Sequence, residues 1–166
     1  MLLIEKNIFS SEECSEIIKM NLQNAKVWYA NDRSYTSFDF FYNEENTWVY
    51  DRFSKFFINE TGIKIKELKK NIHFHKYVEG DKFDLHNDDM RERVYGVGLV
   101  LNNEFEGGDF IFYNPEKIVL SKEVGNAYIF DVRINHQIKI ITSGIRYSML
   151  WFLGKNNLEF EKNNLI

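Results

Sequence analysis

Apolar residues near the start of the chain recur at the spacing of an α-helix. Ser10 and Glu13 stand three positions apart, the reciprocal capping arrangement that begins many helices. Ile18 and Leu22 follow at helical spacing. The pattern predicts a helix over residues 11 to 24.

A second stretch, EENTWVYDRFSKFFINETG, repeats this helical pattern with bulky apolar residues such as Trp48, Phe53 and Phe57. It ends at Gly62, and glycine readily adopts the left-handed conformation that closes a helix. We therefore expect a second amphipathic helix over about residues 45 to 60.

From residue 64 onward the chain consists of short β-branched and aromatic runs punctuated by Gly and Asn. Strands at this spacing predict a mainly β fold, a sandwich or jelly roll, with the two N-terminal helices packed outside it. We expect a single domain over residues 1–166. The predicted strands are NIHFHKYV, RVYGVGLVL, GDFIFY, KIVL, NAYIF, HQIKIIT and GIRYSMLWFL.

The strand RVYGVGLVL has two glycines on one face. Alternation places Val97 and Leu99 toward a core, and Gly96 and Gly98 on the opposite face. Glycine weakens a strand interior, so the pair indicates that a ligand or a neighbouring chain segment comes close there. A tight bend of a barrel would explain the glycines equally well.

Composition narrows the choice of partners and compartment. The chain has 166 residues, 21 of them basic and 25 acidic, and a net charge of −4, which gives no electrostatic reason to expect nucleic acid. Cys14 is the only cysteine, so the chain cannot form an intramolecular disulfide, which is typical of a protein in the reducing cytoplasm. Because Cys14 lies within the predicted helix over residues 11 to 24, we expect a buried structural thiol. The opening MLLIEKNIF lacks the features of a signal peptide, and no run approaches the roughly 20 apolar residues of a membrane span.

The candidate chemistry begins in YVEGDKFDLHNDD. His86 and Asp88 are two positions apart, so on an extended strand both side chains leave one face, while Asp89 leaves the other. A histidine nitrogen and a carboxylate oxygen side by side can fill two corners of a coordination sphere. A second histidine from a distant strand would complete the two-histidine, one-carboxylate set, which leaves open positions on a ferrous ion.

Two other regions contain histidine. His73 and His75 share a strand face, and we expect them to be strand residues with satisfied ring nitrogens. His136 opens HQIKIITSGIRYSMLWF, in which Arg146 follows ten residues later and shares a strand face with Ser148. A guanidinium matches a carboxylate, and the serine hydroxyl could bond the same anion. A metal site combined with an arginine that can bind a dicarboxylate points to 2-oxoglutarate.

Several separated motifs, taken together in this order, resemble a known family. YVEGDKFDLHND reads as YxxGxxFxxHxD, and EGGDFIF, VGNAYIF, NHQIKIITSGIRYSMLWF and the opening NIFSSEECSEIIK also match. Over about residues 6 to 153 the chain resembles the prolyl 4-hydroxylase-like branch of the iron(II)- and 2-oxoglutarate-dependent dioxygenases. The resemblance implies a double-stranded β-helix (jelly roll) that carries the site.

Carried over by position, the resemblance assigns the site residues. It implies His86, Asp88 and His136 as iron ligands and catalytic residues. Arg146 would hold the distal carboxylate of 2-oxoglutarate, and Tyr77 would be a hydroxyl near this cosubstrate. A purely structural role for Tyr77 also remains open. In that case the ring would cover the core and the hydroxyl would lie at the surface.

Two positions depart from the family. Some relatives have tyrosine where this chain has Val100, so Tyr77 or Ser148 would have to supply that hydroxyl. Relatives often place tryptophan six residues beyond the basic residue, whereas Trp151 stands five beyond Arg146. A substrate role therefore does not carry over to Trp151.

The resemblance also implies the reaction. Iron(II), dioxygen and 2-oxoglutarate, with ascorbate as a supporting reductant, would hydroxylate an aliphatic C–H bond and release succinate and carbon dioxide. The implied substrate is proline in a peptide or protein, and otherwise a free amino acid. Two other classes stay open, namely a nucleic-acid demethylase on the same scaffold and a non-catalytic metal-binding β-barrel module.

Three further features have alternative interpretations. ANDRSYTSFDFFYNEE, residues 30 to 45, could be a lid in which Arg33 meets a carboxylate, or an ordinary edge strand with a flanking loop. EGGD suits a hairpin turn that shapes the site. We expect the remaining acidic residues of this region to be solvated, namely Asp81, Asp84 and Asp109.

Overall fold

The computed structural model describes residues 1–23, 27–28 and 35–161. These residues form two helices and a larger number of strands, which confirms the predicted mainly β fold. Neither of the helices in this part of the chain is long and apolar enough to cross a membrane.

Both helices lie where the sequence predicts them. Helix α1 spans Ser11–Gln23 and helix α2 spans Thr47–Thr61. At the start of α1, the backbone N–H of Glu13 donates to Ser10 Oγ at 3.1 Å, and Ser10 N–H donates to Glu13 Oε2 at 3.0 Å. Helix α2 ends at Gly62, whose φ of 71° is left-handed. The predicted capping box and glycine cap are therefore confirmed.

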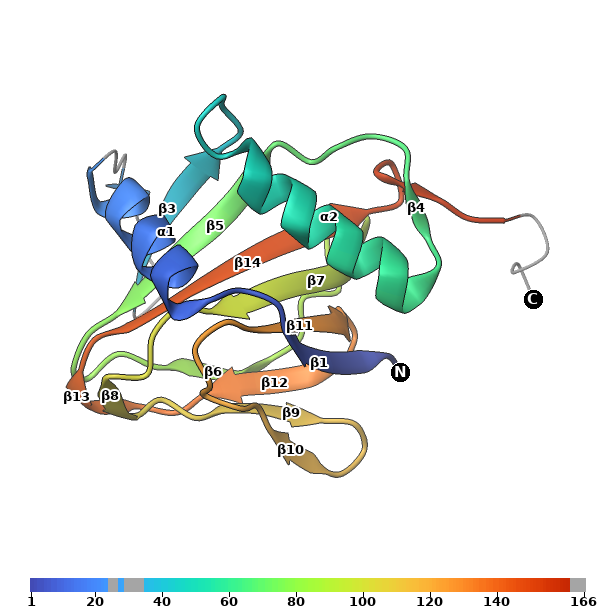
Figure 1. Cartoon of the computed structure of the whole chain (residues 1–166). Coiled ribbons are helices and arrows are strands. Elements are labelled where there is room, and N and C mark those ends of the chain that lie inside the picture. Colours follow the sequence, from blue (N-terminus) through green and yellow to red (C-terminus); the bar gives the residue numbers. More distant parts are fainter. Residues whose placement is uncertain (24–26, 29–34, 162–166) are drawn as a thin grey trace.

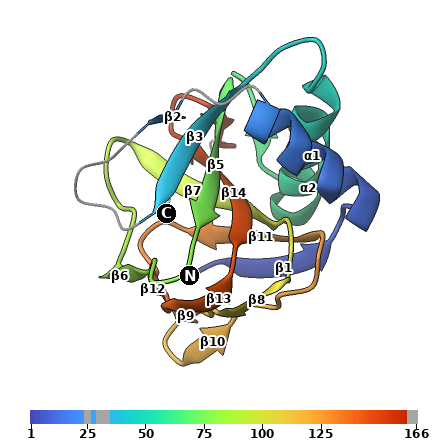
Figure 2. The same cartoon turned by 90° about the vertical axis from the view of Figure 1, so that its left-hand side faces the viewer.

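The strands form one large sheet, one small sheet and two strand pairs (Figures 1 and 2). In the seven-stranded sheet the order is β1 (Leu3–Asn7), β11 (Asn126–Asp131), β7 (Arg93–Val100), β14 (Arg146–Gly154), β5 (Asn71–Tyr77), β3 (Thr36–Phe41) and β2 (Val27–Trp28). The four-stranded sheet has the order β10 (Lys117–Val119), β9 (Phe110–Tyr113), β12 (Asn135–Ile138) and β6 (Phe83–His86). The pairs are β13 (Ile141–Gly144) with β8 (Phe105–Gly107), and β15 (Leu158–Glu159) with β4 (Lys64–Ile65).

The two faces of the large sheet are covered differently. Both helices lie over one face, and the small sheet lies toward the other (Figures 1 and 2). Apolar side chains between the helices and the sheet, such as Phe53 and Trp151, form one core, and a second core around Phe112 and Phe130 lies between the sheets. The space beside this second core contains the candidate site.

Helix α1 carries the lone cysteine into the first core. Cys14 is fully buried, and burial raises the pKa of its thiol to about 12. This confirms the prediction of a buried structural thiol.

An ion pair joins the two helices. The Arg52 guanidinium of α2 donates to both carboxylate oxygens of Glu13, at 2.9 and 3.0 Å, and also to the carbonyl oxygen of Ile8 at 2.8 Å. Glu13 therefore caps α1 and fixes α2 against it.

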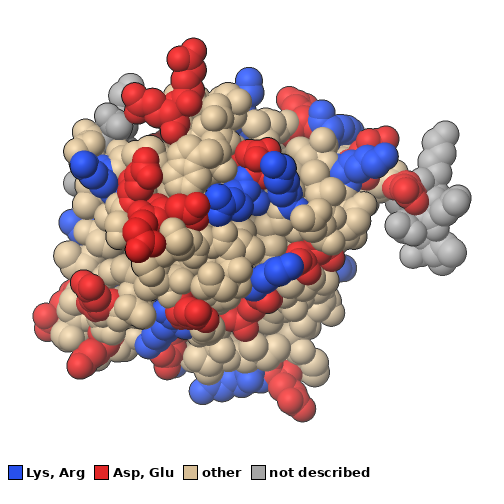
Figure 3. All heavy atoms as spheres, in the orientation of Figure 1, with Lys and Arg blue, Asp and Glu red and all other residues tan. Residues whose placement is uncertain are grey.

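Over the helix-bearing face of the molecule, acidic and basic side chains are interspersed (Figure 3).

The paired glycines of β7 make room for aromatic rings of the adjacent strand. Gly96 and Gly98 pair with Phe130 and Tyr128 of β11. A Cβ on Gly96 would lie 2.3 Å from the Phe130 ring, and one on Gly98 would lie 2.0 Å from the Tyr128 ring. The close approach predicted from the sequence is therefore that of a neighbouring chain segment.

Several strands were not predicted, and one predicted strand is divided. The run HQIKIIT forms both β12 and β13, which pair with different partners. Strands β1, β2, β4, β8 and β15 were not predicted, because most are short and all except β2 pair with segments distant in sequence. Strand β3 lies within residues 30 to 45 and supports the strand interpretation of that stretch, whereas Arg33 lies outside the described residues.

Candidate metal and cosubstrate site

Two adjacent strands of the small sheet bring two histidines together. His86 ends β6 and His136 lies in β12, and the two residues are direct cross-strand partners. Their ring centroids are 4.4 Å apart. Pairing of β6 with β12 thus joins positions fifty residues apart in the chain.

The structure corrects the expected course of the chain at Asp88. The segment was expected to stay extended through this residue, but β6 ends at His86. Asp88 instead lies in the loop that follows, where its backbone N–H donates to the carbonyl oxygen of Val132 at 2.8 Å. This hydrogen bond directs the Asp88 side chain inward, where the residue is 7% exposed, while Asp89 is exposed.

His86, Asp88 and His136 form a compact cluster of metal-ligand atoms. One ligand atom from each residue lies within 4.8 Å of the others. Nε2 of His86 lies 3.7 Å from Asp88 Oδ1, and Nε2 of His136 lies 3.2 Å from Asp88 Oδ2. A single cation could contact all three side chains at this spacing.

The backbone favours the ring tautomer that a metal requires. Nδ1 of His86 lies 2.6 Å from the carbonyl oxygen of Asp84, and Nδ1 of His136 lies 2.9 Å from the carbonyl oxygen of Ile134. A carbonyl only accepts hydrogen bonds, so each Nδ1 carries the proton when the ring is neutral. The lone pair of each Nε2 then faces the cluster.

The Asp88 carboxylate is also suited to a cation. Burial raises its pKa, but the neighbouring His136, His86 and Arg93 outweigh this effect, so the pKa lies below the ordinary range. Oδ2 is buried and has no hydrogen-bond partner among the described residues. A buried, ionised and unsatisfied oxygen is costly unless a ligand completes it, so these residues fit a metal ion.

Arg146 lies in the same cavity as the cluster. It is 4% exposed, and one guanidinium nitrogen donates to Ser148 Oγ at 2.9 Å. The guanidinium lies 5.2 Å from the centre of the Tyr77 ring and 5.7 Å from that of Phe110. No described carboxylate forms an ion pair with it. A buried guanidinium that has no carboxylate partner can bind an anionic ligand.

Tyr77 lies at the same end of the cavity. Its ring is 1% exposed and stacks on Tyr35 with centroids 4.4 Å apart. Burial raises the pKa of its phenol well above the usual value. Tyr77 lines the cavity instead of placing its hydroxyl at the surface, which agrees with the pocket alternative.

Tyr128 is a cavity residue that the sequence reasoning missed. Its ring fills the space above Gly98, and burial raises the pKa of its phenol to about 12. Tyr128 lines the same cavity as Arg146 and Asp88. The glycine pair of β7 indicated that a bulky group lies against this strand. The sequence did not show that the group is Tyr128, because this depends on the pairing of β7 with β11.

The cavity has a volume of about 1120 Å³. Alternate residues of two adjacent strands form its floor, including His73, His75 and Tyr77 from β5 and Leu150 and Phe152 from β14. His73 and His75 are thus cavity residues, with Nδ1 of His73 lying 3.7 Å from Asp39.

Other residues singled out in the sequence lie elsewhere. Gly107 and Gly108 have φ angles of 71° and 65°, which confirms a turn at EGGD. The prediction that this turn closes a hairpin is wrong, because β8 pairs with β13 while β9 pairs with β10 and β12. Asp109 lies 2.6 Å from Lys122 and Asp84 lies 3.0 Å from Lys82, so both form ion pairs. Asp81 is half-buried, and its carboxylate accepts a hydrogen bond from the backbone N–H of Val78. The indole of Trp151 is buried in the helix-side core.

No protein-family model matches the chain, and no curated protein matches it. Solved structures do. An oxidoreductase of the 2OG-Fe(II) oxygenase family from Burkholderia pseudomallei matches with a TM-score of 0.75 at 13% identity, over 93% of this chain and 86% of that one. A prolyl-4-hydroxylase from Pseudomonas putida matches with a TM-score of 0.72 at 14% identity, over 92% of each chain.

A third structure contains a bound peptide. A prolyl hydroxylase from Trichoplax adhaerens, in complex with a peptide fragment of the hypoxia inducible factor oxygen degradation domain, matches with a TM-score of 0.70 at 16% identity, over 92% of this chain and 84% of that one. The chain therefore has the fold of the 2OG-Fe(II) oxygenases, including prolyl hydroxylases. This confirms, at the level of fold, the family resemblance found in the sequence.

Proposed function

We propose that this chain is an iron(II)- and 2-oxoglutarate-dependent dioxygenase, with residues 1–166 forming one catalytic domain built on a double-stranded β-helix. The observation that carries the proposal is that one cavity contains both the His86, Asp88 and His136 cluster and the buried guanidinium of Arg146, which has no carboxylate partner among the described residues. Each feature alone has structural explanations. Together they provide a cation site and a carboxylate site, and 2-oxoglutarate needs both.

His86, Asp88 and His136 would hold the iron. Bound iron would use dioxygen and 2-oxoglutarate to insert one oxygen atom into an aliphatic C–H bond, while the other enters succinate and carbon dioxide is released. The rings of Phe112 and Phe130, whose centres lie 5.2 and 5.1 Å from that of His136, would shield the metal from water on that side. Ascorbate would support turnover as a reductant.

Arg146 would hold the distal carboxylate of 2-oxoglutarate. Its hydrogen bond to Ser148 fixes the guanidinium before the anion arrives, which lowers the entropic cost of binding. Tyr77 and Tyr128 have raised pKa values, so both phenols keep their protons at neutral pH and can donate to a carboxylate. Tyr128 would supply the hydroxyl that the chain lacks at Val100.

The shape of the cavity favours a peptide over a free amino acid. The β5 face from Asn71 to Tyr77 spans about 20 Å at roughly 3.3 Å per residue. A floor of this length accommodates several residues of an extended chain in addition to the cosubstrate. The Trichoplax adhaerens neighbour has a bound peptide, and proline is the first target to test.

Succinate release tests the proposal directly. The full chain, supplied with iron(II), ascorbate, 2-oxoglutarate and proline-containing peptides, is expected to produce succinate, and the peptides to gain the mass of one oxygen atom. Free amino acids are tested as substrates in a second set of assays. The proposal fails if no mixture yields succinate above the level without iron, or if zinc supports the same yield.

A further inference from the structure

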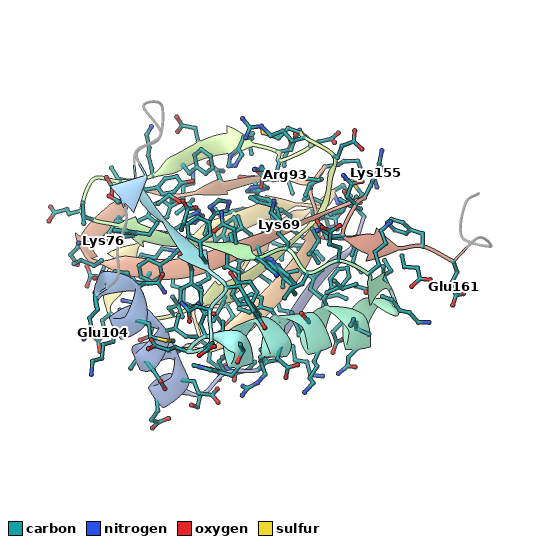
Figure 4. All side chains as sticks on the ribbon, turned by 90° about the horizontal axis from the view of Figure 1, so that it is seen from above. Lys69, Lys76, Arg93, Glu104, Lys155 and Glu161 are labelled. Carbon is teal, nitrogen blue, oxygen red and sulfur yellow. The ribbon has the colours of Figure 1, made fainter. Side chains whose placement is uncertain are left out.

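The cavity continues beyond the metal cluster into a second region, which we call the cationic arm. Two separate segments line it. Lys66, Lys69 and Lys70 come from the segment between β4 and β5, Arg91 comes from the turn between β6 and β7, and Arg93 is the first residue of β7. In the view of Figure 4, Lys69 and Arg93 project over the same part of the sheet, whereas Lys76 lies toward the other end.

The lysine segment is fixed to the fold by backbone hydrogen bonds. The indole N–H of Trp151 donates to the carbonyl oxygen of Lys69 at 2.8 Å. The carbonyl oxygen of Asn157 accepts from the Lys66 N–H at 2.9 Å, and its side-chain amide donates to the carbonyl of Glu67 at 3.1 Å. The lysines therefore extend from an anchored backbone, which lowers the entropic cost of binding a partner.

The arginine turn has an uncommon backbone. Arg91 and Glu92 have φ angles of 51° and 62°, a region that L-residues other than glycine seldom adopt. The N–H of Arg93 donates to Met90 O at 3.1 Å, and the N–H of Lys155 donates to Glu92 O at 3.0 Å. Such conformations persist where surrounding contacts hold them, and they cluster at binding sites.

Arg93 links the cationic arm to the metal cluster. Its guanidinium lies 3.9 Å from Asp88 Oδ1 and 3.7 Å from the centre of the Phe152 ring. Phe152 belongs to the cavity floor, two residues beyond Leu150, which pairs with His73. The arm therefore begins beside the metal site.

The arm has an excess of positive charge. Lys66, Lys69 and Arg91 form no ion pair with any carboxylate in the described part of the chain. Among the acidic residues that line the same end, Glu92 pairs with Lys155 at 3.5 Å, and Asp39 accepts a hydrogen bond from Asn71 at 3.0 Å. Unpaired cations at one end of a cavity raise the local concentration of anionic groups.

We propose that the cationic arm binds an acidic residue of an extended peptide substrate, roughly two to four residues from the position that is hydroxylated. This inference rests on the proposed function, because it names the substrate class of the same site. A peptide is favoured over a nucleic acid because Glu67 and Glu92 alternate with the cations and would repel a continuous phosphate backbone. The net charge of −4 acts in the same direction.

Direct binding of peptide pools tests the proposal without turnover. The probes are fluorescein-labelled nine-residue peptides with a randomised centre, and they carry two glutamates, two lysines or two serines on one side of it. Fluorescence anisotropy with the full chain is expected to show about tenfold tighter binding of one glutamate pool than of the matching lysine pool. The preference should shrink as salt increases, because the arm is exposed to solvent.

Charge reversal locates the preference. The double variant Lys69→Glu, Arg91→Glu is expected to lose the preference for glutamate or to reverse it. Lys76→Glu is the matched control, because Lys76 lies on the opposite face of β5 and does not line the cavity. Lys69 and Arg91 are exposed, so the double variant is expected to fold.

Three results would overturn the proposal: equal binding of all pools, an equal effect of the control variant, or tighter binding of a single-stranded oligonucleotide than of either glutamate pool. The last result would indicate a nucleic-acid partner. Binding of glutamate peptides without succinate production would leave the arm intact and refute the dioxygenase proposal. Succinate production without a charge preference would support the dioxygenase proposal and refute the role of the cationic arm.

Discussion

The two faces of strand β14 have opposite chemistry. Met149, Trp151 and Leu153 face the helices and are fully buried in an apolar core. Arg146 and Ser148 face the cavity and are almost as deeply buried, although both are polar. Buried residues occur on both faces, so burial alone does not distinguish these two groups of residues.

What differs between the two faces is whether the buried groups are satisfied. On the helix side, the indole N–H of Trp151 has its acceptor in the carbonyl oxygen of Lys69. On the cavity side, Arg146 has no carboxylate partner among the described residues, and Asp88 Oδ2 has no hydrogen-bond partner there. Unsatisfied buried charge lowers stability, so its presence on one face supports the proposal that this face binds ligands.

The largest expected effect is the loss of turnover in Asp88→Ala. Removing a carboxylate ligand should lower iron content and reduce succinate production by about a thousandfold or more, without lowering the Tm, because the carboxylate is unsatisfied in the fold. Asp89→Ala is the matched control and should retain activity within about twofold. Metal analysis, succinate assay and thermal melting measure the three quantities. Equal losses in both variants would contradict the assignment of Asp88.

On the helix side, Trp151→Ala should affect stability first. Removal of this fully buried side chain is expected to lower the free energy of unfolding by about 3–5 kcal/mol. Leu150 lies one position away, faces the cavity and is only half-buried, so Leu150→Ala should cost only about 1 kcal/mol. Urea denaturation measures both. If Leu150→Ala proved the more costly substitution, the contrast between the two faces would be wrong.

Arg146→Gln should weaken the binding of 2-oxoglutarate by about a hundredfold, because a buried charge-assisted contact is lost. The KM for 2-oxoglutarate is the readout, and the urea midpoint should not fall. Arg133→Gln is the control, since Arg133 is exposed and pairs with Asp131 instead. An unchanged KM in Arg146→Gln would place the cosubstrate elsewhere.

Tyr128→Phe is expected to have a smaller effect of the same kind. Loss of one phenolic hydrogen bond should raise the KM for 2-oxoglutarate about five- to tenfold, which corresponds to about 1 kcal/mol. Tyr147→Phe removes a hydroxyl from the helix-facing side of β14 and serves as the comparison. The role of Tyr128 is refuted if both variants behave alike.

The smallest effect concerns the helix junction. The hydrogen bond from Arg52 lowers the pKa of Glu13 in the folded state, so the associated stability is present above the unfolded pKa and is lost as pH falls through the lower, folded value. Glu13→Gln should therefore cost about 0.5 kcal/mol at neutral pH, because the pair is partly exposed. Urea unfolding at neutral pH and near pH 3 should show the difference from the wild type shrinking in acid, whereas a constant difference would rule out this ion pair as the cause.

Local signals in the sequence predicted the helices well. The capping box at Ser10 and the glycine at position 62 act through neighbouring backbone groups, so their effect depends little on the rest of the fold. The long strands with clear alternation were also predictable. Strand β1 was not, because it is defined by pairing with β11, more than a hundred residues away.

Some residues of the candidate site could likewise be predicted from the sequence, and others could not. Its His-x-Asp motif and Arg146 could be proposed from spacing and family resemblance. The inward direction of Asp88 was expected for the wrong reason, since a hydrogen bond to Val132, and not strand alternation, turns it. Tyr128 and the cationic arm depend on which strands and loops are neighbours in space, and a single sequence does not contain that information.

The most direct test of the central claim is an anaerobic titration of the full chain with iron(II) and 2-oxoglutarate, followed by visible absorption. A shared cation and carboxylate site predicts that one iron binds per chain and that adding 2-oxoglutarate then produces a metal-to-cosubstrate charge-transfer band. The band should be absent in Asp88→Ala and should require much more 2-oxoglutarate in Arg146→Gln. An iron-loaded wild-type protein that gives no band at saturating 2-oxoglutarate would contradict the account.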